Sequence, residues 1–123
     1  MKICFKLALI LFPANIVWAA GDAAKGEVQF GPCTACHTII EGGADLTGPN
    51  LFGVAGREAG QNSKSFAYSP ALKSSEIVWT DEKLDLWIKS PGALVPGAKM
   101  EFVGISRAET RANIIAYMKS KSK

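Results

Sequence analysis

The apolar residues of this chain follow a helical period only in short stretches, which are separated by loops. The first stretch begins at Asp22, a favourable N-cap, carries Val28 and Phe30, and is expected to end at Gly31-Pro32. Residues 38–65 are rich in Gly, Asn and Thr, and their apolar residues keep no sustained period. We predict that this segment is an ordered loop wrapped around another group.

Two more helices are predicted in the middle of the chain. Ser69 followed by Pro70 is typical of an N-cap and a first helical position, so a short helix should run through about residue 74. Thr80 precedes two acidic residues, which stabilise a first helical turn because its backbone N–H groups carry partial positive charge. Apolar residues then recur at the helical spacing from Leu84 onward.

The last third of the chain contains a loop and a final helix. Pro91 is expected to end the preceding helix, and residues 91–104 hold several prolines and glycines, so we predict an extended loop there. Ser106 with Glu109 matches a capping box and should start the last helix. The apolar face of that helix is formed by Ile114, Tyr117 and Met118. Few residues alternate with a period of two, so the fold class is all-α.

The N-terminal residues have the order of a secretory signal peptide. Two lysines are followed by an apolar run over residues 7–12, which breaks at Pro13. This run is well short of the roughly 18 to 20 residues that cross a bilayer. We predict a signal peptide over residues 1–19, cleaved after Ala19 or Ala20, and one domain over residues 20–123. An uncleaved segment that tethers the protein to a membrane is the alternative.

The charge balance argues against a nucleic-acid partner. The full chain has 14 basic and 11 acidic residues, a formal net charge of +3. Cleavage would remove Lys2 and Lys6, so 12 basic residues would face 11 acidic ones, a net charge of +1. No block of lysine and arginine remains to bind a phosphate backbone. A domain this small has a marginal core, which a large apolar prosthetic group would stabilise.

Three reactive side chains lie within five consecutive residues. The sequence Cys33-Thr34-Ala35-Cys36-His37 is C-x-x-C-H, the attachment motif of a c-type haem. Two thiols one helical turn apart can each add to one haem vinyl group, and the adjacent imidazole can bind the iron from the same side. The iron would then need a sixth ligand.

Three other interpretations of the motif were weighed. A zinc site needs about four ligands, and no second cluster of Cys or His exists to complete one. A thioredoxin-like redox pair needs a βαβ pattern, which the chain lacks. A disulfide between Cys33 and Cys36 suits an exported chain but leaves His37 without a role. Haem attachment accounts for all three side chains.

Further stretches follow the motif in a characteristic order. They are Gly48-Pro49-Asn50-Leu51, Gly56-Arg57, Trp79, Pro96-Gly97-Ala98-Lys99-Met100 and Ile114-Ile115-Ala116-Tyr117. With these stretches the chain resembles the class I cytochromes c of the mitochondrial and purple-bacterial type over nearly its whole mature length. The resemblance implies a small fold of four to five helices and long loops wrapped around one covalently bound haem c.

The resemblance also implies roles for residues outside the motif. Met100 should be the second axial ligand, opposite His37, because a soft thioether favours ferrous iron. Met118 competes for this role but lies on a helix face where Met is more often core. The Pro49 carbonyl should accept the Nδ1 proton of His37. Arg57, Tyr68 and Trp79 are expected near the haem propionates, and Phe102 at the haem edge.

Some positions depart from the resemblance. Leu72, Trp87 and Ala98 stand where relatives commonly have smaller or more polar hydrogen-bonding groups, so we expect a drier crevice. Lys99 and Arg107 match the basic ring around the exposed haem edge, but other positions of that ring are uncharged. Electrostatic steering toward acidic partners should therefore be weak.

The resemblance implies a monomeric periplasmic electron carrier. It would pass single electrons from a membrane cytochrome bc-type donor to a terminal oxidase or a photosynthetic reaction centre. An enzyme is not expected, because His37 and Met100 together would leave no open coordination position on the iron. A haem peroxidase and a membrane-tethered electron-transfer module are the competing hypotheses.

Overall fold

The computed structural model describes residues 9–13 and 20–122. The predicted signal peptide therefore falls mostly outside the described residues, as does cleavage after Ala19, and both stay predictions. The described elements are, in order, α1 (Ala23–Gln29), the 3₁₀ helix η1 (Gly31–Ala35), α2 (Pro70–Lys73), α3 (Asp81–Lys89), α4 (Pro91–Leu94) and α5 (Ala108–Ser120). Extended pairing within these ranges is limited to one isolated bridge, between Glu58 and Val78. The all-α prediction is confirmed.

Three predicted N-caps are confirmed, each through a side-chain oxygen that accepts backbone N–H groups left free by the first helical turn. The Asp22 carboxylate accepts from two such groups at the start of α1, at 2.9 and 3.1 Å. The Ser69 hydroxyl caps α2 at 3.1 Å, and the Thr80 hydroxyl caps α3 at 3.2 Å. These caps depend on neighbours in sequence, which is why the pattern located them.

Two predicted chain breaks at proline were wrong. Pro32 does not stop the first helical segment but lies in the first turn of η1, and Pro91 opens α4 where an extended loop was expected. Proline has no N–H, but a first turn leaves its N–H groups unpaired anyway, so proline is tolerated there. Val28, placed on the first helix by the pattern, is exposed because α1 turns Gly26 and not Val28 toward the core.

The capping box predicted for the last helix is also absent. Arg107 is the N-cap of α5, and it makes no side-chain capping bond. The helix begins where the Arg111 N–H donates to the carbonyl of Arg107 at 3.2 Å, one residue after Ser106. The carbonyl of Ser106 instead accepts from the Arg111 guanidinium at 2.8 Å. A tertiary contact therefore moves the helix start.

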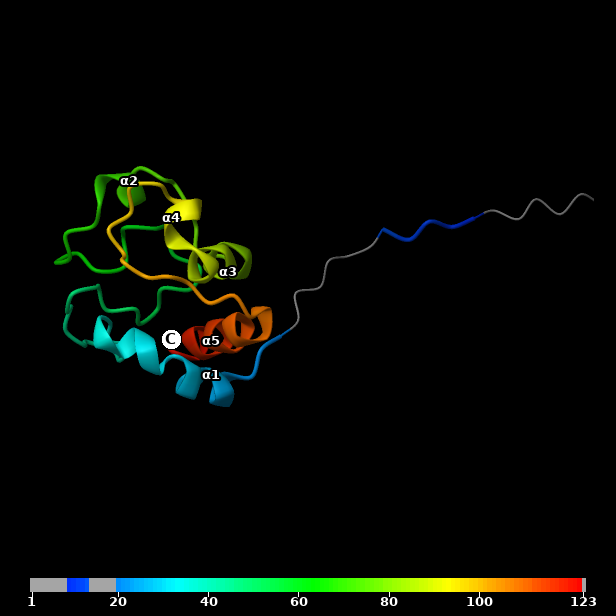
Figure 1. Ribbon diagram of the computed structural model, residues 1–123, viewed down its shortest axis with the longest axis horizontal. Helices are drawn as coiled ribbons and strands as arrows, with labels where there is room; N and C mark the ends of the chain where they lie inside the picture. Colours follow the sequence, from blue (N-terminus) through cyan, green and yellow to red (C-terminus); the bar gives the residue numbers. More distant parts are fainter. Residues whose placement is uncertain (1–8, 14–19, 123) are drawn as a thin grey trace, which may run out of the picture.

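The first and last helices lie side by side in the lower part of Figure 1. Gly26 permits this approach, because a Cβ at that position would collide with the Asn113 carbonyl on α5. The rings of Phe30 and Tyr117 meet with centroids 5.3 Å apart, and Ile114 is 1% exposed. The contact expected between these helices is confirmed.

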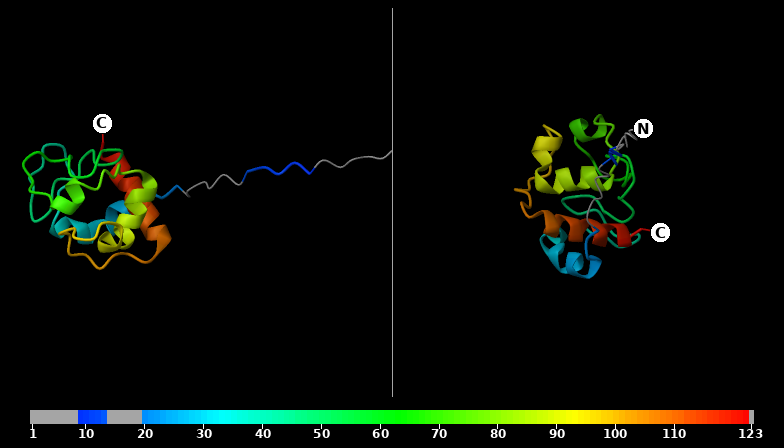
Figure 2. Two further views of the ribbon diagram at one scale, coloured as in Figure 1. Left: turned by 90° about the horizontal axis from the view of Figure 1, so that it is seen from above. Right: turned by 90° about the vertical axis from the view of Figure 1, so that its right-hand side faces the viewer.

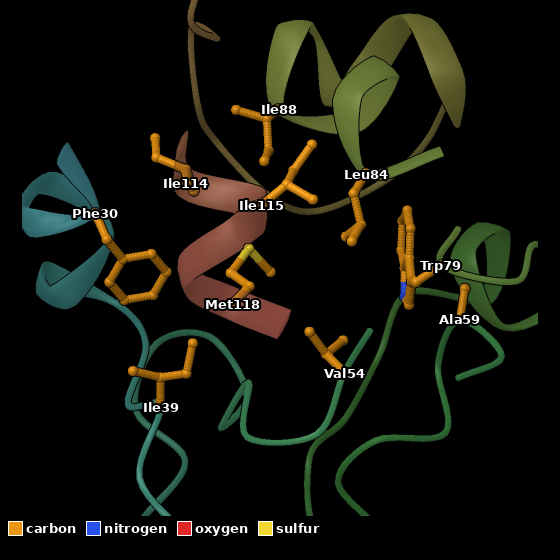
Figure 3. Close-up of a cluster of buried hydrophobic side chains, with 10 residues drawn as sticks. All are labelled: Phe30, Ile39, Val54, Ala59, Trp79, Leu84, Ile88, Ile114, Ile115 and Met118. Atoms are coloured by element: carbon orange, nitrogen blue, oxygen red, sulfur yellow. The ribbon is translucent and has the colours of Figure 1, made fainter. Parts of the chain in front are cut away.

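The core joins these two helices to α3 and to the long loops. Figure 3 shows Met118 and Ile115 of α5 among Leu84, Ile88 and Val54, side chains from α3 and from the loop. The segment between η1 and α2, drawn in green, gathers at one side of the helices in the left view of Figure 2. No helix of the described ranges is long and apolar enough to span a bilayer.

Candidate functional site

A cavity of about 540 Å³ lies between the helices and the long loops. Its walls are mostly apolar, with contributions from η1, α3, α5 and the segment after α4. The predicted site residues that line it are Cys33, Cys36, His37, Pro49, Tyr68, Trp79 and Met100, together with Phe102 and Lys99. The cavity is within the size range of cofactor sites. Long loops, which carry no helical period, thus form much of the wall of a binding site.

The 3₁₀ helix η1 brings the motif residues to one wall. The N–H groups of Cys36 and His37 both donate to the carbonyl of Cys33, at 3.1 and 2.9 Å, so the chain completes a turn between the two thiols. Both thiols are free, and burial raises the pKa of Cys33. No disulfide joins them, so they remain available for thioether bonds.

His37 is held rigidly beside the thiols. Its Nδ1–H donates to the Pro49 carbonyl at 2.7 Å, as predicted. The Gly48 N–H donates to the Cys36 carbonyl at 2.8 Å, and a Cβ on Gly48 would collide with the imidazole ring. Burial lowers the pKa of His37, and the hydrogen bond to Pro49 offsets part of this shift. The neutral imidazole, which is the metal-binding form, is thereby favoured, with Nε2 free.

Two methionines reach the same cavity. Met100 is half-buried in the loop after α4, whereas Met118 is 5% exposed and packs within the hydrophobic cluster of α5 (Figure 3). The prediction that Met118 belongs to the core is confirmed. The two thioethers differ in the backbone that carries them, since one lies on a loop and the other on a buried helix face.

The three side chains expected near the propionates are not all at the cavity. Tyr68 and Trp79 are buried and line it, and burial raises the pKa of Tyr68. Arg57 is exposed and does not line the cavity, although its carbonyl accepts from the Trp79 N–H at 2.8 Å. Leu72, Trp87 and Ala98, the three departures, all line the cavity.

Sequence reasoning missed Asn62 as a wall residue. Its Nδ2 donates to the carbonyls of Asn50 and Phe52, at 2.8 and 3.1 Å, which fixes the orientation of the amide. Its Oδ1 is buried and has no donor among the described residues. A single asparagine in a loop carries no sequence pattern that could have identified it.

Asp45 ties together two loops beside the site. Its Oδ1 accepts from the Asn50 N–H at 2.8 Å, and its Oδ2 accepts from the hydroxyls of Ser63 and Ser65, both at 2.7 Å. These three hydrogen bonds, chiefly that from Asn50, hold the pKa of Asp45 below its usual value. The loop that carries Pro49 is therefore fastened to the loop that carries Tyr68.

Replacing Asp45 by asparagine is expected to weaken acid-sensitive stability. A lowered folded pKa means that the ionised group stabilises the fold fully above the unfolded pKa of about 3.8, and that this stability is lost as pH falls through the folded pKa. At pH 7 the variant should lose about 0.5–1.5 kcal/mol for each hydrogen bond it cannot keep. Denaturant unfolding of holoprotein from pH 7 to pH 3 measures this. A constant difference between the two proteins across that range would contradict the prediction.

The donor set fits a covalently bound haem. Two free thiols, a neutral imidazole with one nitrogen already bonded, and a thioether face a mostly apolar cavity. Within the described ranges, no group of three or more His, Cys, Asp and Glu side chains is placed to hold a metal ion. The zinc interpretation therefore lacks its ligands in this part of the chain.

Comparison with known proteins identifies relatives along most of the chain. It is 45% identical over 109 residues to cytochrome c of Theileria annulata, covering 88% of this chain and 93% of the relative. It is 43% identical over 115 residues to cytochrome c2 of Blastochloris viridis, covering 94% and 87%. The solved structure of cytochrome cH from Methylobacterium extorquens matches with a TM-score of 0.78 and 44% identity, over 82% of this chain and 100% of that one. No family model matches. The chain belongs to the class I cytochromes c and binds haem c covalently.

Proposed function

We propose that the protein is a monomeric electron carrier of the periplasm. It takes single electrons from a membrane cytochrome bc-type complex and delivers them to a terminal oxidase or a photosynthetic reaction centre. The observation that supports this most is the lining of the cavity, where His37 and Met100 both face a mostly apolar space beside two free thiols. Relatives named cytochrome c and cytochrome c2 agree with this role.

The side chains divide the work of holding the haem. Cys33 and Cys36 bind it by thioether bonds, while His37 and Met100 occupy the two axial positions. When bound, the haem iron alternates between Fe(III) and Fe(II), so it accepts and releases one electron. The Pro49 carbonyl keeps the imidazole in one tautomer and orientation, which limits rearrangement between oxidation states.

The propionates are assigned to the end of the cavity that Tyr68 and Trp79 line. Both residues are buried, and their O–H and N–H groups are donors that can offset buried negative charge. Arg57 is exposed. We assign it a weaker electrostatic role through the same wall, since its carbonyl is bonded to the Trp79 backbone.

A carrier is favoured over a peroxidase because both axial positions have a ligand from the chain. Peroxide needs an open position on the iron. Rapid peroxide turnover by native protein with Met100 still bound would reverse this ranking.

A redox-titrated visible spectrum of the periplasmic fraction tests the proposal. We expect one c-type haem that titrates as a single one-electron transition, with the weak sulfur-to-iron band in the ferric form. N-terminal sequencing should find a start at Ala20 or Gly21. A haem spectrum confined to membranes, with residues 1–19 retained, would support the tethered module instead.

Electron-transfer rates should fall only gently with added salt. Lys99 and Arg107 are both exposed and are nearly the only cations assigned to the docking face. Few charges give weak long-range attraction, so there is little for salt to screen over the Debye length of about 8–10 Å. Stopped-flow rates with a purified membrane partner measure this. A steep decline between low and physiological salt would mean that other cations line the interface.

A further inference from the structure

The guanidinium of Arg111 joins two helices to the end of the Met100 loop. Arg111 lies on α5 and is 6% exposed. Its Nε donates to Asp85 Oδ1 on α3 at 2.6 Å. Its Nη1 donates to the carbonyls of Ile105 and Ser106, at 2.9 and 2.8 Å. One buried side chain therefore connects α3, α5 and the segment that returns from Met100.

The same end of the loop is pressed against α3. The Ile105 N–H donates to the Ile88 carbonyl at 3.0 Å. Gly104 has φ +91, and a Cβ there would collide with the Lys89 carbonyl, so the backbones are in close contact. In Figure 1 this segment, drawn in orange, runs from α4 to the start of α5. The contacts with Arg111 and α3 form one anchor.

Met100 itself lies between anchors and has none of its own in the backbone. The upstream anchor is the Ala98 N–H, which donates to the Val95 carbonyl at 3.1 Å. Between Ala98 and Ile105, no backbone hydrogen bond joins the segment to another backbone group in the part of the chain that the structure describes. The position of Met100 is therefore set by the two ends of its loop.

We propose that Arg111, oriented by Asp85, is a positioning residue that keeps Met100 on the iron. This inference rests on the proposed ligand role of Met100. Without the two bonds from Nη1, the carbonyls of Ile105 and Ser106 lose their charged donor, and the downstream anchor loosens. Met100 then leaves the iron more often, and small external ligands compete with it more effectively.

The chain contains a matched control for this interaction. Asp81 and Lys119 also join α3 to α5, through an ion pair at 3.0 Å, but their side chains are 46% and 51% exposed. Neither is hydrogen-bonded to residues 95–107 among the described contacts. Asp81→Asn therefore removes an ion pair between the same two helices and leaves the loop anchor in place. Ile115→Val, in the core of α5 and away from the cavity wall, controls for a general loss of stability.

The test measures imidazole binding to the ferric holoprotein, since imidazole must displace the sixth ligand. Arg111→Lys keeps the positive charge but loses the planar fork that reaches a carboxylate and two carbonyls at once. We expect Arg111→Lys and Asp85→Asn to raise imidazole affinity about tenfold or more, equivalent to losing about 1.4 kcal/mol of Met100 binding. Asp81→Asn and Ile115→Val should stay within about twofold. If Asp85→Asn does not fold, Asp85→Glu should show a smaller rise in the same direction.

Each other outcome overturns the proposal. Unchanged imidazole affinity in folded Arg111→Lys and Asp85→Asn means that the anchor does not position Met100. An equal rise in Asp81→Asn or Ile115→Val means that stability alone controls binding. Failure of the proposed function is distinguished by Met100→Ala, because a sulfur-to-iron band that survives this substitution shows that Met100 is not the ligand.

Discussion

Replacing Met100 by alanine is expected to abolish the weak sulfur-to-iron charge-transfer band of the ferric protein. The reduction potential should fall by a few tenths of a volt, within the roughly 0.8 V range over which axial ligands set haem potentials. Loss of the thioether removes the soft ligand that favours ferrous iron, and it opens the iron to peroxide and carbon monoxide. Visible spectra, a redox titration and carbon monoxide binding measure these three effects.

The competing methionine provides the matched control. Met118→Leu should leave all three properties unchanged and cost at most about 1.5 kcal/mol of stability, since it is a near-isosteric change in a packed core. Met100 follows His37 by 63 residues and lies on a loop, whereas Met118 lies on α5 between Ile114 and Ile115 on one side and the loops on the other. Bringing Met118 to the iron would require unpacking α5. A band that survives Met100→Ala and disappears in Met118→Leu would reverse the assignment.

Replacing both Cys33 and Cys36 by alanine is expected to leave a chain without haem that does not fold. The cavity of about 540 Å³ would then have no occupant held in it. At roughly 24 cal/mol per Å³, an unfilled cavity of this size costs on the order of 10 kcal/mol, which is comparable with the whole stability of a small domain, about 5–15 kcal/mol. Haem absorbance in the purified protein and far-UV circular dichroism with urea unfolding measure attachment and folding.

Single substitutions and a neighbour make this result specific. Either cysteine replaced alone should impair covalent attachment without preventing it fully, because one thioether can still form. Thr34→Ala lies between the cysteines, leaves both thiols in place, and removes only an exposed hydrogen bond to the Gly31 carbonyl. It should retain haem. A compact double variant that unfolds cooperatively without haem would refute the prediction.

Local features of the sequence were sufficient to predict most helices. The N-caps at Asp22, Ser69 and Thr80 depend on a side chain and the two or three residues that follow it, so no distant contact is needed to place them. The attachment motif is local for the same reason, because the spacing of its thiols is set by a single turn at Cys33. The contact of Gly26 with α5 was predicted through the family resemblance.

Contacts between distant residues decided the rest. The start of α5 and the anchor of the Met100 loop both depend on Arg111, whose partners include Asp85, 26 residues away. The propionate assignment of Arg57 could not be tested by position in sequence, and the structure leaves its side chain exposed.

The sequence by itself determined the fold class, the helix caps and the haem-attaching residues, because each is specified by side chains within about one helical turn. Only the tertiary structure decided which loop residues form the cavity wall, such as Asn62, and how Asp45 fastens two loops together. Such hydrogen bonds join residues 10 to 20 positions apart with no periodic spacing, so they become visible only when the packing of the helices has fixed the path of the loops between them.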